Sequence, residues 1–134
     1  VFSTPWELTI TPLDTCGNVF LQGDNFERLK ESSDPLAQAV LQNHFAWCEA
    51  VKDWPIFSNM DPNVQSSLLY DTVAVYLAFS ETLLEMEQLP IIVTDDGKTL
   101  VDDGGQLVNC AMQWKDQTAF ESLLTKRLLN EDQR

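Results

Sequence analysis

The chain has 134 residues, of which 44% are hydrophobic, so it is long and apolar enough to bury a core as one domain spanning 1–134. It carries 21 Asp and Glu against 8 Lys and Arg, which gives a formal net charge of −13. This charge argues against nucleic-acid binding through a basic patch and against attachment to an anionic membrane, and it favours a protein partner with a basic surface. The alternative is that the negative charge only keeps the protein in solution.

The N-terminal part is predicted to form a β-hairpin. Residues 6–10 alternate apolar and polar side chains, as a half-buried strand does. Turn-forming residues follow over 14–18, and the apolar run 19–21 has the length of a returning strand. We therefore expect two strands joined by a loop longer than two residues.

Two helices are predicted in the next segment. A capping-box pattern predicts a short helix over 24–31. Asp34 followed by proline predicts a second helix over 35–53. The aspartate side chain accepts N–H bonds of the first turn, and proline at the first helical position loses no hydrogen bond because an N–H there has no partner within the helix. An apolar stripe along this second helix predicts that one side of it faces the core.

Residues 62–88 are predicted to form a long central helix. Asp61 followed by proline repeats the helix-start pattern, and apolar side chains cover well over half of the expected circumference. Such a helix would be packed from more than one side. At about 1.5 Å per residue it would be ~40 Å long, which is long for so small a domain. The alternatives are that the helix breaks near Ser80 or that it exposes one end to a partner.

The C-terminal part is predicted to combine strands with a last helix. Three short apolar runs between 91 and 110 are separated by Asp- and Gly-rich turns, and an apolar stripe begins near Thr118. The predicted fold class is α+β. Three to four helices pack around the long central helix (62–88), and a small antiparallel sheet is formed by the N-terminal and 91–110 hairpins.

Cysteine usage predicts an intracellular protein. Cys16, Cys48 and Cys110 are odd in number and do not form a dense disulfide framework, so we expect reduced thiols in the cytoplasm, or in the host cytoplasm or virion for a viral protein. The alternative is one disulfide and one free thiol. No basic stretch followed by an apolar stretch opens the sequence, so no signal peptide is expected. The longest apolar run, 73–79, is too short to span a membrane.

His44 and Cys48 are the residues most able to carry chemistry. They lie one helical turn apart on the predicted 35–53 helix, so their side chains point the same way. We expect a buried histidine beside a small buried thiol. The alternatives are a thiol–imidazole catalytic pair and a metal site, which would need further ligands such as Cys16, Cys110 or carboxylates.

An acidic cluster over 95–103 raises the question of calcium binding. Its spacing does not match an EF-hand loop, and no glutamate closes it. Turn-forming aspartates explain the cluster without a ligand. No cofactor and no metal are therefore predicted.

A candidate protein-binding patch follows the 35–53 helix. Aromatic side chains stand next to aspartates there, and no Lys or Arg occurs from Asp53 to Gly97. We predict that the partner contacts an acidic face with aromatic anchors. The alternative is that this linker folds back onto the core. The predicted partner-binding residues are Asp53, Trp54, Phe57, Asp61, Asp71, Glu81, Glu85, Asp95 and Asp96.

The predicted function is that of a non-enzymatic acidic binding protein. An inhibitor, an immunity protein or a nucleic-acid mimic would each dock a basic surface of another macromolecule and occlude it. The alternative is a structural assembly subunit, such as a viral or phage head–tail or tail component, which would form a homo-oligomer. The third hypothesis is a small enzyme that uses His44 and Cys48.

Overall fold

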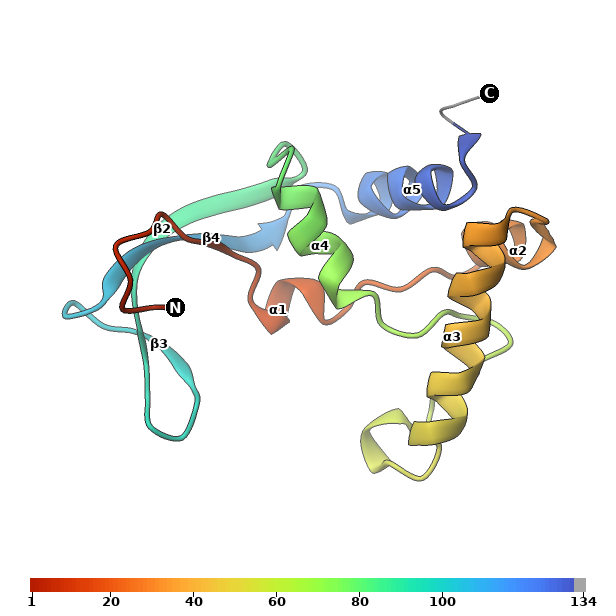
Figure 1. Cartoon of the computed structure of the whole chain (residues 1–134), viewed down its shortest axis with the longest axis horizontal. Coiled ribbons are helices and arrows are strands. Elements are labelled where there is room, and N and C mark those ends of the chain that lie inside the picture. Colours follow the sequence, from red (N-terminus) through yellow and green to blue (C-terminus); the bar gives the residue numbers. More distant parts are fainter. Residues whose placement is uncertain (132–134) are drawn as a thin grey trace. The chain divides into compact units, whose positions relative to one another are not determined.

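The computed structural model describes residues 1–131 and has an α+β architecture (Figure 1). The chain divides into two compact units. The sheet unit comprises Val1–Gly17 and Tyr70–Asp116. The helical unit comprises Asn18–Leu69 and Gln117–Arg134, of which 132–134 lie outside the described residues.

The sheet unit is built on a four-stranded mixed sheet with the order β1-β4-β2-β3. Strand β1 pairs with β4 in parallel, whereas β2 pairs antiparallel with both β4 and β3. Two helices, α1 and α4, belong to the same unit. The elements are β1 (Thr9–Ile10), α1 (Leu13–Cys16), α4 (Tyr70–Leu77), β2 (Leu84–Val93), β3 (Thr99–Val101) and β4 (Gln106–Trp114).

Around Ile91 and Val108, one face of this sheet is covered and the other is open. Ile91, Val108 and Cys110 are buried on the covered face, together with partly buried residues of the N-terminal segment. Side chains alternate between faces along a strand, so the neighbouring positions point the other way. On that open face, Leu107 is 62% exposed next to its cross-strand partner Pro90.

A tight turn and a helix contact fix β4 in place. A Cβ atom at Gly105 would lie 2.5 Å from the backbone of Ile91, so only glycine fits there. At the other end of the strand, the Trp114 indole N–H donates to the Thr15 carbonyl over 2.9 Å. The Thr15 hydroxyl lies 2.7 Å from the Ala111 carbonyl oxygen, which ties α1 to β4.

The helical unit packs its helices around a separate apolar core. Asp34 caps α3 as predicted, because its Oδ1 accepts the Leu36 N–H over 2.9 Å. The elements are α2 (Asp24–Glu31), α3 (Pro35–Val51), the 3₁₀-helix η1 (Pro55–Phe57) and α5 (Gln117–Leu128). The buried core residues are Leu21, Phe26, Leu29, Ala37, Leu41 and Leu129.

The predicted long central helix over 62–88 is wrong. Only Tyr70–Leu77 is helical, and Leu84–Val93 is strand β2. Residues 84–87 alternate apolar and acidic, which is a strand period, and pairing with β4 uses their backbone groups. Residues 65–69 are extended and bond to 19–22 instead, as in the Leu69 N–H donating to the Val19 carbonyl over 2.8 Å.

The predicted N-terminal hairpin is also wrong, and with it the purely antiparallel sheet. Strand β1 pairs with β4, about a hundred residues away, and 13–16 is helical where a turn was expected. The apolar run 19–21 finds its partners in 65–69. Both segments are extended as predicted, but their partners lie far along the chain. The predicted helices at 24–31, 35–53 and 118 onward are confirmed, with small shifts of their ends. The three strands within 91–110 are also confirmed, although β2 begins at Leu84 and β4 continues to Trp114.

Candidate protein-docking site

An exposed aromatic cluster follows the end of α3. We call residues 53–61 the aromatic loop. Trp54 is 57% exposed and Ile56 is 81% exposed. The Phe57 ring stacks on Trp54 with centroids 6.2 Å apart, and it meets Trp47 of α3 edge-on at 4.8 Å. The loop therefore presents an apolar surface that already rests on a packed ring.

Consecutive turns hold this loop together. The Trp54 N–H donates to the Val51 carbonyl over 2.9 Å, and the Phe57 N–H donates to the Trp54 carbonyl over 3.0 Å. The Met60 N–H then donates to the Phe57 carbonyl over 3.0 Å. Pro55 ends α3 because its ring prevents the preceding residue from continuing a helix. The loop is thus a chain of closed turns whose shape is fixed before any partner binds.

A cavity of about 390 Å³ lies between α3 and the aromatic loop. Phe45, Phe57 and Met60 contribute its apolar lining, and Glu49 and Lys52 contribute charged groups. Phe45 is itself 42% exposed, so the apolar surface extends from the loop onto α3. The cavity offers a recess for a side chain of a docked protein.

The carboxylates around the loop are not equivalent. The Lys52 ammonium pairs with Glu49 at 2.5 Å, which offsets that carboxylate. Asp61 accepts the Asn63 N–H over 2.9 Å and faces its side-chain amide. Among residues 1–131, no ion pair is found for Asp53 or Asp61. The aromatic loop therefore has an uncompensated carboxylate at each end.

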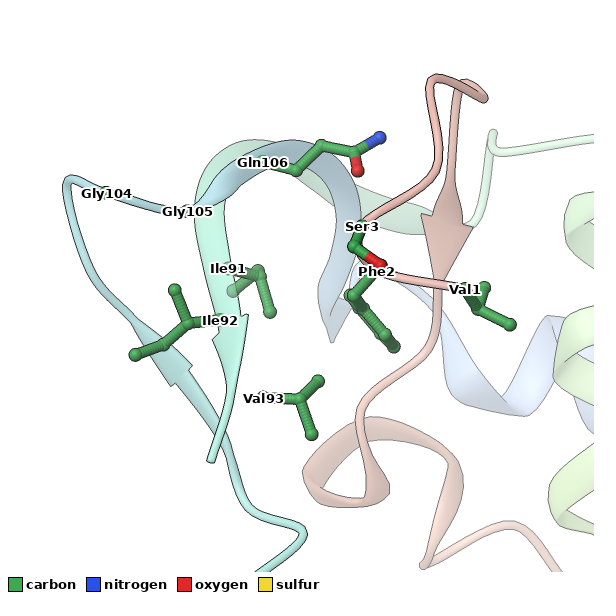
Figure 2. Close-up of a pocket in the computed structure, with 9 residues that line it drawn as sticks. All are labelled: Val1, Phe2, Ser3, Ile91, Ile92, Val93, Gly104, Gly105 and Gln106. Atoms are coloured by element: carbon green, nitrogen blue, oxygen red, sulfur yellow. The ribbon is translucent and has the colours of Figure 1, made fainter. Parts of the chain in front are cut away.

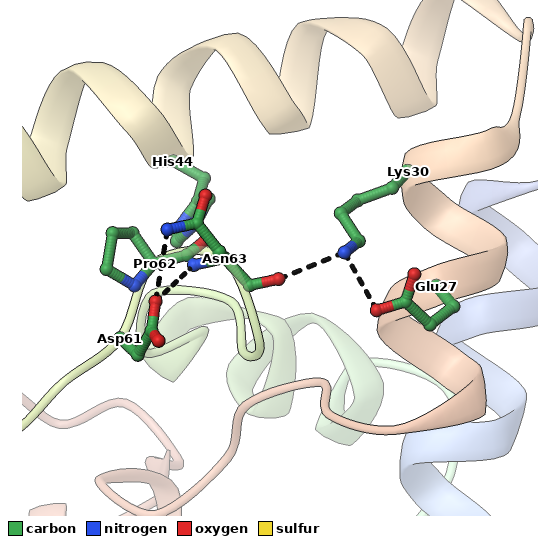
Figure 3. A network of polar contacts seen from close by, with 6 residues as sticks. All are labelled: Glu27, Lys30, His44, Asp61, Pro62 and Asn63. Carbon is green, nitrogen blue, oxygen red and sulfur yellow. Dashed lines mark hydrogen bonds and ion pairs between the residues drawn. The ribbon is translucent and has the colours of Figure 1, made fainter.

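His44 anchors the segment that follows the loop (Figure 3). The Ser67 backbone N–H lies 2.8 Å from Nδ1 of His44, and the Pro62 carbonyl oxygen lies 2.8 Å from Nε2. A backbone N–H can only donate, so Nδ1 accepts and Nε2–H donates to Pro62. The Lys30 ammonium, paired with Glu27, donates to the Asn63 carbonyl over 3.0 Å. These contacts fix the backbone on which Asp61 is carried.

Cys48 is placed as a buried structural thiol. Its Sγ lies 3.4 Å from Nδ1 of His44, a nitrogen that already accepts the Ser67 N–H. Burial raises the pKa of the Cys48 thiol, although a backbone hydrogen bond opposes part of this shift. The arrangement therefore favours the protonated thiol, whereas a thiol–imidazole nucleophile needs the thiolate. Cys16, Cys48 and Cys110 are all free and buried.

Two of the predicted acidic residues flank the exposed side of α4 in the sheet unit. Asp71 lies in the first turn of this helix, and Glu81 follows its end. Val75 and Phe79, which succeed Asp71 at four-residue steps, are 64% and 63% exposed. The structure thus places these carboxylates next to a second apolar surface.

The remaining predicted residues lie at opposite ends of β2. Glu85 accepts a hydrogen bond from the Gln113 side chain at the start of the strand. Asp95 and Asp96 lie in the turn that follows its end, where the Lys98 ammonium and the Thr94 hydroxyl lower the pKa of Asp96. At about 3.3 Å per residue, these two groups are roughly 30 Å apart along the strand.

The predicted site residues are therefore divided between the two units. The structure brings Asp53, Trp54, Phe57 and Asp61 together in the aromatic loop. It places the other predicted carboxylates in the sheet unit. Sequence reasoning missed Ile56, the most exposed large apolar side chain of the loop, although the pattern Trp-Pro-Ile-Phe contains it.

The sheet unit also contains a cavity of about 750 Å³ (Figure 2). Phe2 of the N-terminal segment and Ile91 and Val93 of β2 give it an apolar lining, with Ser3 and Gln106 as polar groups. Figure 2 shows Gly104 and Gly105 in the turn beside it. No titratable side chain lines this cavity among the described residues.

Searches for other site types and for relatives give negative findings. Within residues 1–131, no three His, Cys, Asp or Glu side chains are grouped as a metal site would require. No described helix combines the length and apolarity that crossing a bilayer requires. The sequence matches no protein-family model and no curated protein.

Proposed function

We propose that this protein is a non-enzymatic docking protein that binds a basic protein surface through the aromatic loop, residues 53–61. One observation carries the proposal: exposed Trp54 stacks on the ring of Phe57 beside exposed Ile56, and the loop ends in Asp53 and Asp61, for which no ion pair is found among residues 1–131. Aromatic anchors surrounded by polar groups are typical of the residues that dominate binding energy at protein interfaces.

The physical argument separates the contributions of the rings and the charges. The rings are held by contacts with each other and by closed turns, so little conformational entropy is lost when they are buried against a partner. The carboxylates and the overall charge of −13 attract a basic partner and accelerate the encounter. Occlusion of the partner's surface is the mechanism by which an inhibitor, immunity protein or nucleic-acid mimic of this kind acts.

The test compares two exposed tryptophans. Trp54→Ala removes the anchor, and Trp6→Ala is the matched control because Trp6 is 62% exposed and lies in the sheet unit. Binding to immobilised lysozyme, cytochrome c and a linker histone is measured at low and high salt. We expect at least one affinity to fall by about tenfold in Trp54→Ala and to stay unchanged in Trp6→Ala. Equal affinities of both variants for every probe would show attraction by charge alone and contradict the proposal.

The exposed side of α4 favours a second candidate, a self-assembling structural subunit. Val75 and Phe79 form an apolar surface of the kind that neighbouring copies bury. Light scattering distinguishes the two candidates. A docking protein stays monomeric or dimeric at micromolar concentration, whereas a subunit forms large rings or tubes that Phe79→Asp disperses.

A further inference from the structure

Strand β3 forms one edge of the sheet and is bonded to β2 on one side only. The Asp102 N–H donates to the Pro90 carbonyl over 2.9 Å, and the Thr94 N–H donates to the Lys98 carbonyl over 2.9 Å. These two bonds show which residues of the β3 segment direct their backbone groups toward β2. They are Lys98, Leu100 and Asp102.

The intervening residues of β3 direct their backbone groups outward. In an antiparallel ladder, bonded and non-bonded pairs alternate, so Thr99 and Val101 point their N–H and C=O groups away from β2. Among the described residues, neither Thr99 nor Val101 has a partner on that outer side. Such an edge is a template on which an extended segment can add as a further strand.

Apolar side chains accompany this edge on both faces of the sheet. Leu100 is 46% exposed and lies beside Ile92 on the open face, where Leu107 of β4 is also exposed. Val101 is 61% exposed on the opposite face, paired with Ile91. An added strand would therefore find apolar contacts for alternate side chains.

The two turns that flank β3 are strongly acidic. The single base among them, Lys98, pairs with Asp96 at 2.7 Å. This leaves an excess of negative charge before and after the strand, all of it exposed. The carboxylates are Asp95, Asp96, Asp102 and Asp103.

We propose that the free edge of β3 binds an extended segment of a partner protein in which basic residues alternate with apolar ones. Main-chain bonds to Thr99 and Val101 would add the segment as a fifth strand, and its lysines or arginines would meet the flanking aspartates. This surface belongs to the sheet unit and does not depend on the aromatic loop. It extends the function from a folded basic partner to a linear basic motif.

Charge also argues against a second copy as the occupant. Two β3 edges side by side would bring eight aspartates together against two lysines. Like charges in opposing strands destabilise pairing, and charged residues next to an edge are a common protection against self-association. A basic segment removes that repulsion and replaces it with attraction.

The experiment measures binding of a fluorescent peptide of alternating lysine and valine to the whole protein by anisotropy. Val101→Pro removes the outward N–H and leaves the β2–β3 bonds intact, since proline is tolerated where a strand N–H faces solvent. Asp95→Asn with Asp103→Asn lowers the flanking charge. A peptide N-methylated at alternate residues keeps every charge but loses its donors, which tests the unaltered protein. Trp54→Ala is the control for the aromatic loop.

We expect the affinity to fall about tenfold with Val101→Pro and with the methylated peptide, and by a smaller factor with the asparagine variant. Trp54→Ala should bind as the wild type does, and amide NMR shifts should concentrate at 99–103. Absence of peptide binding at low salt overturns the proposal, as does undiminished binding of the methylated peptide. A dimer that Val101→Pro dissociates also overturns it, because the occupant would then be a second copy.

Discussion

The helical unit and the sheet unit both expose apolar surface next to carboxylates, but they build these surfaces differently. In the helical unit, packed rings of the aromatic loop are held by local turns, and the bonds of His44 hold the segment that follows the loop. In the sheet unit, the surface is an open face and a strand edge whose main-chain groups are free. The first suits recognition by side chains, and the second suits recognition by the backbone. A net charge of −13 is therefore compatible with two separate contact modes in one chain.

The largest expected effect tests whether the two units are energetically separate. Gly105→Ala places a Cβ atom 2.5 Å from the backbone of Ile91, which cannot move aside. We expect a loss of about 3 kcal/mol in the free energy of unfolding. Denaturant titration measures it, and hydrogen exchange shows where protection is lost. Loss confined to the sheet unit would establish independent units, whereas loss in both would support the predicted single domain.

Gly104→Ala is the matched control for this substitution. Its Cβ atom would lie 3.1 Å from an Asp102 side-chain oxygen, which can rotate away. We expect a cost below about 1 kcal/mol. An equal cost for the two alanines would contradict the close approach at Gly105.

The next effect tests how the helical unit holds the segment after the aromatic loop. His44→Ala leaves the Ser67 N–H without its acceptor and the Pro62 carbonyl without its donor. An unpaired buried group costs ~1–3 kcal/mol, and both of these bonds are only partly buried, so we expect a combined loss near the low end, about 2–3 kcal/mol. Gln42→Ala, on the exposed side of α3, should change stability by less than about 0.5 kcal/mol. Unfolding of His44→Ala at the wild-type denaturant midpoint would contradict the anchoring role.

Alkaline pH provides a smaller test of the buried thiols. Burial raises the pKa of Cys48 above its ordinary 9.0, so the folded state holds its proton more tightly than the unfolded state does. The contribution of this proton to the unfolding free energy is fully present below about pH 9 and is lost as the pH rises through the folded-state pKa of Cys48. The unfolding free energy should therefore fall as the pH rises above about 9, and less steeply in Cys48→Ala. Rapid alkylation of Cys48 at neutral pH would instead indicate a reactive thiolate.

The smallest effect concerns the exposed ion pair beside the aromatic loop. Lys52→Ala removes the partner of Glu49, which is worth at most about 0.5 kcal/mol on the surface. It also makes the surroundings of the loop more negative. We expect an unchanged melting temperature and association with a basic probe that is about twofold faster at low salt. A large loss of stability would show that the pair shapes the loop.

Local signals account for what the sequence predicted well. Asp34 and Pro35 define the start of α3 by capping chemistry, and glycine- and aspartate-rich turns separate β2, β3 and β4. The errors involve partners distant in sequence. No local pattern near residues 84–88 indicates that this segment pairs with β4. Counting hydrophobic residues over 62–88 as one window also hides the alternating pattern typical of strand β2.

The candidate site shows the same limit. The burial of His44 and its one-turn relation to Cys48 follow from helical spacing. The hydrogen-bond partners of His44, at positions 62 and 67, could not be predicted from any local sequence pattern. The aromatic loop was identified because its residues are contiguous, whereas the separation of the carboxylates required the strand geometry.

The order of the segments has a consequence for folding during synthesis. Residues 18–69 are inserted between the two parts of the sheet unit, and α5 returns to the helical unit after β4. About a hundred further residues must therefore be synthesised after β1 before its pairing partner in β4 is available. The two-residue strand stays unpaired throughout that interval, and pairing between segments so distant in sequence is expected to slow folding.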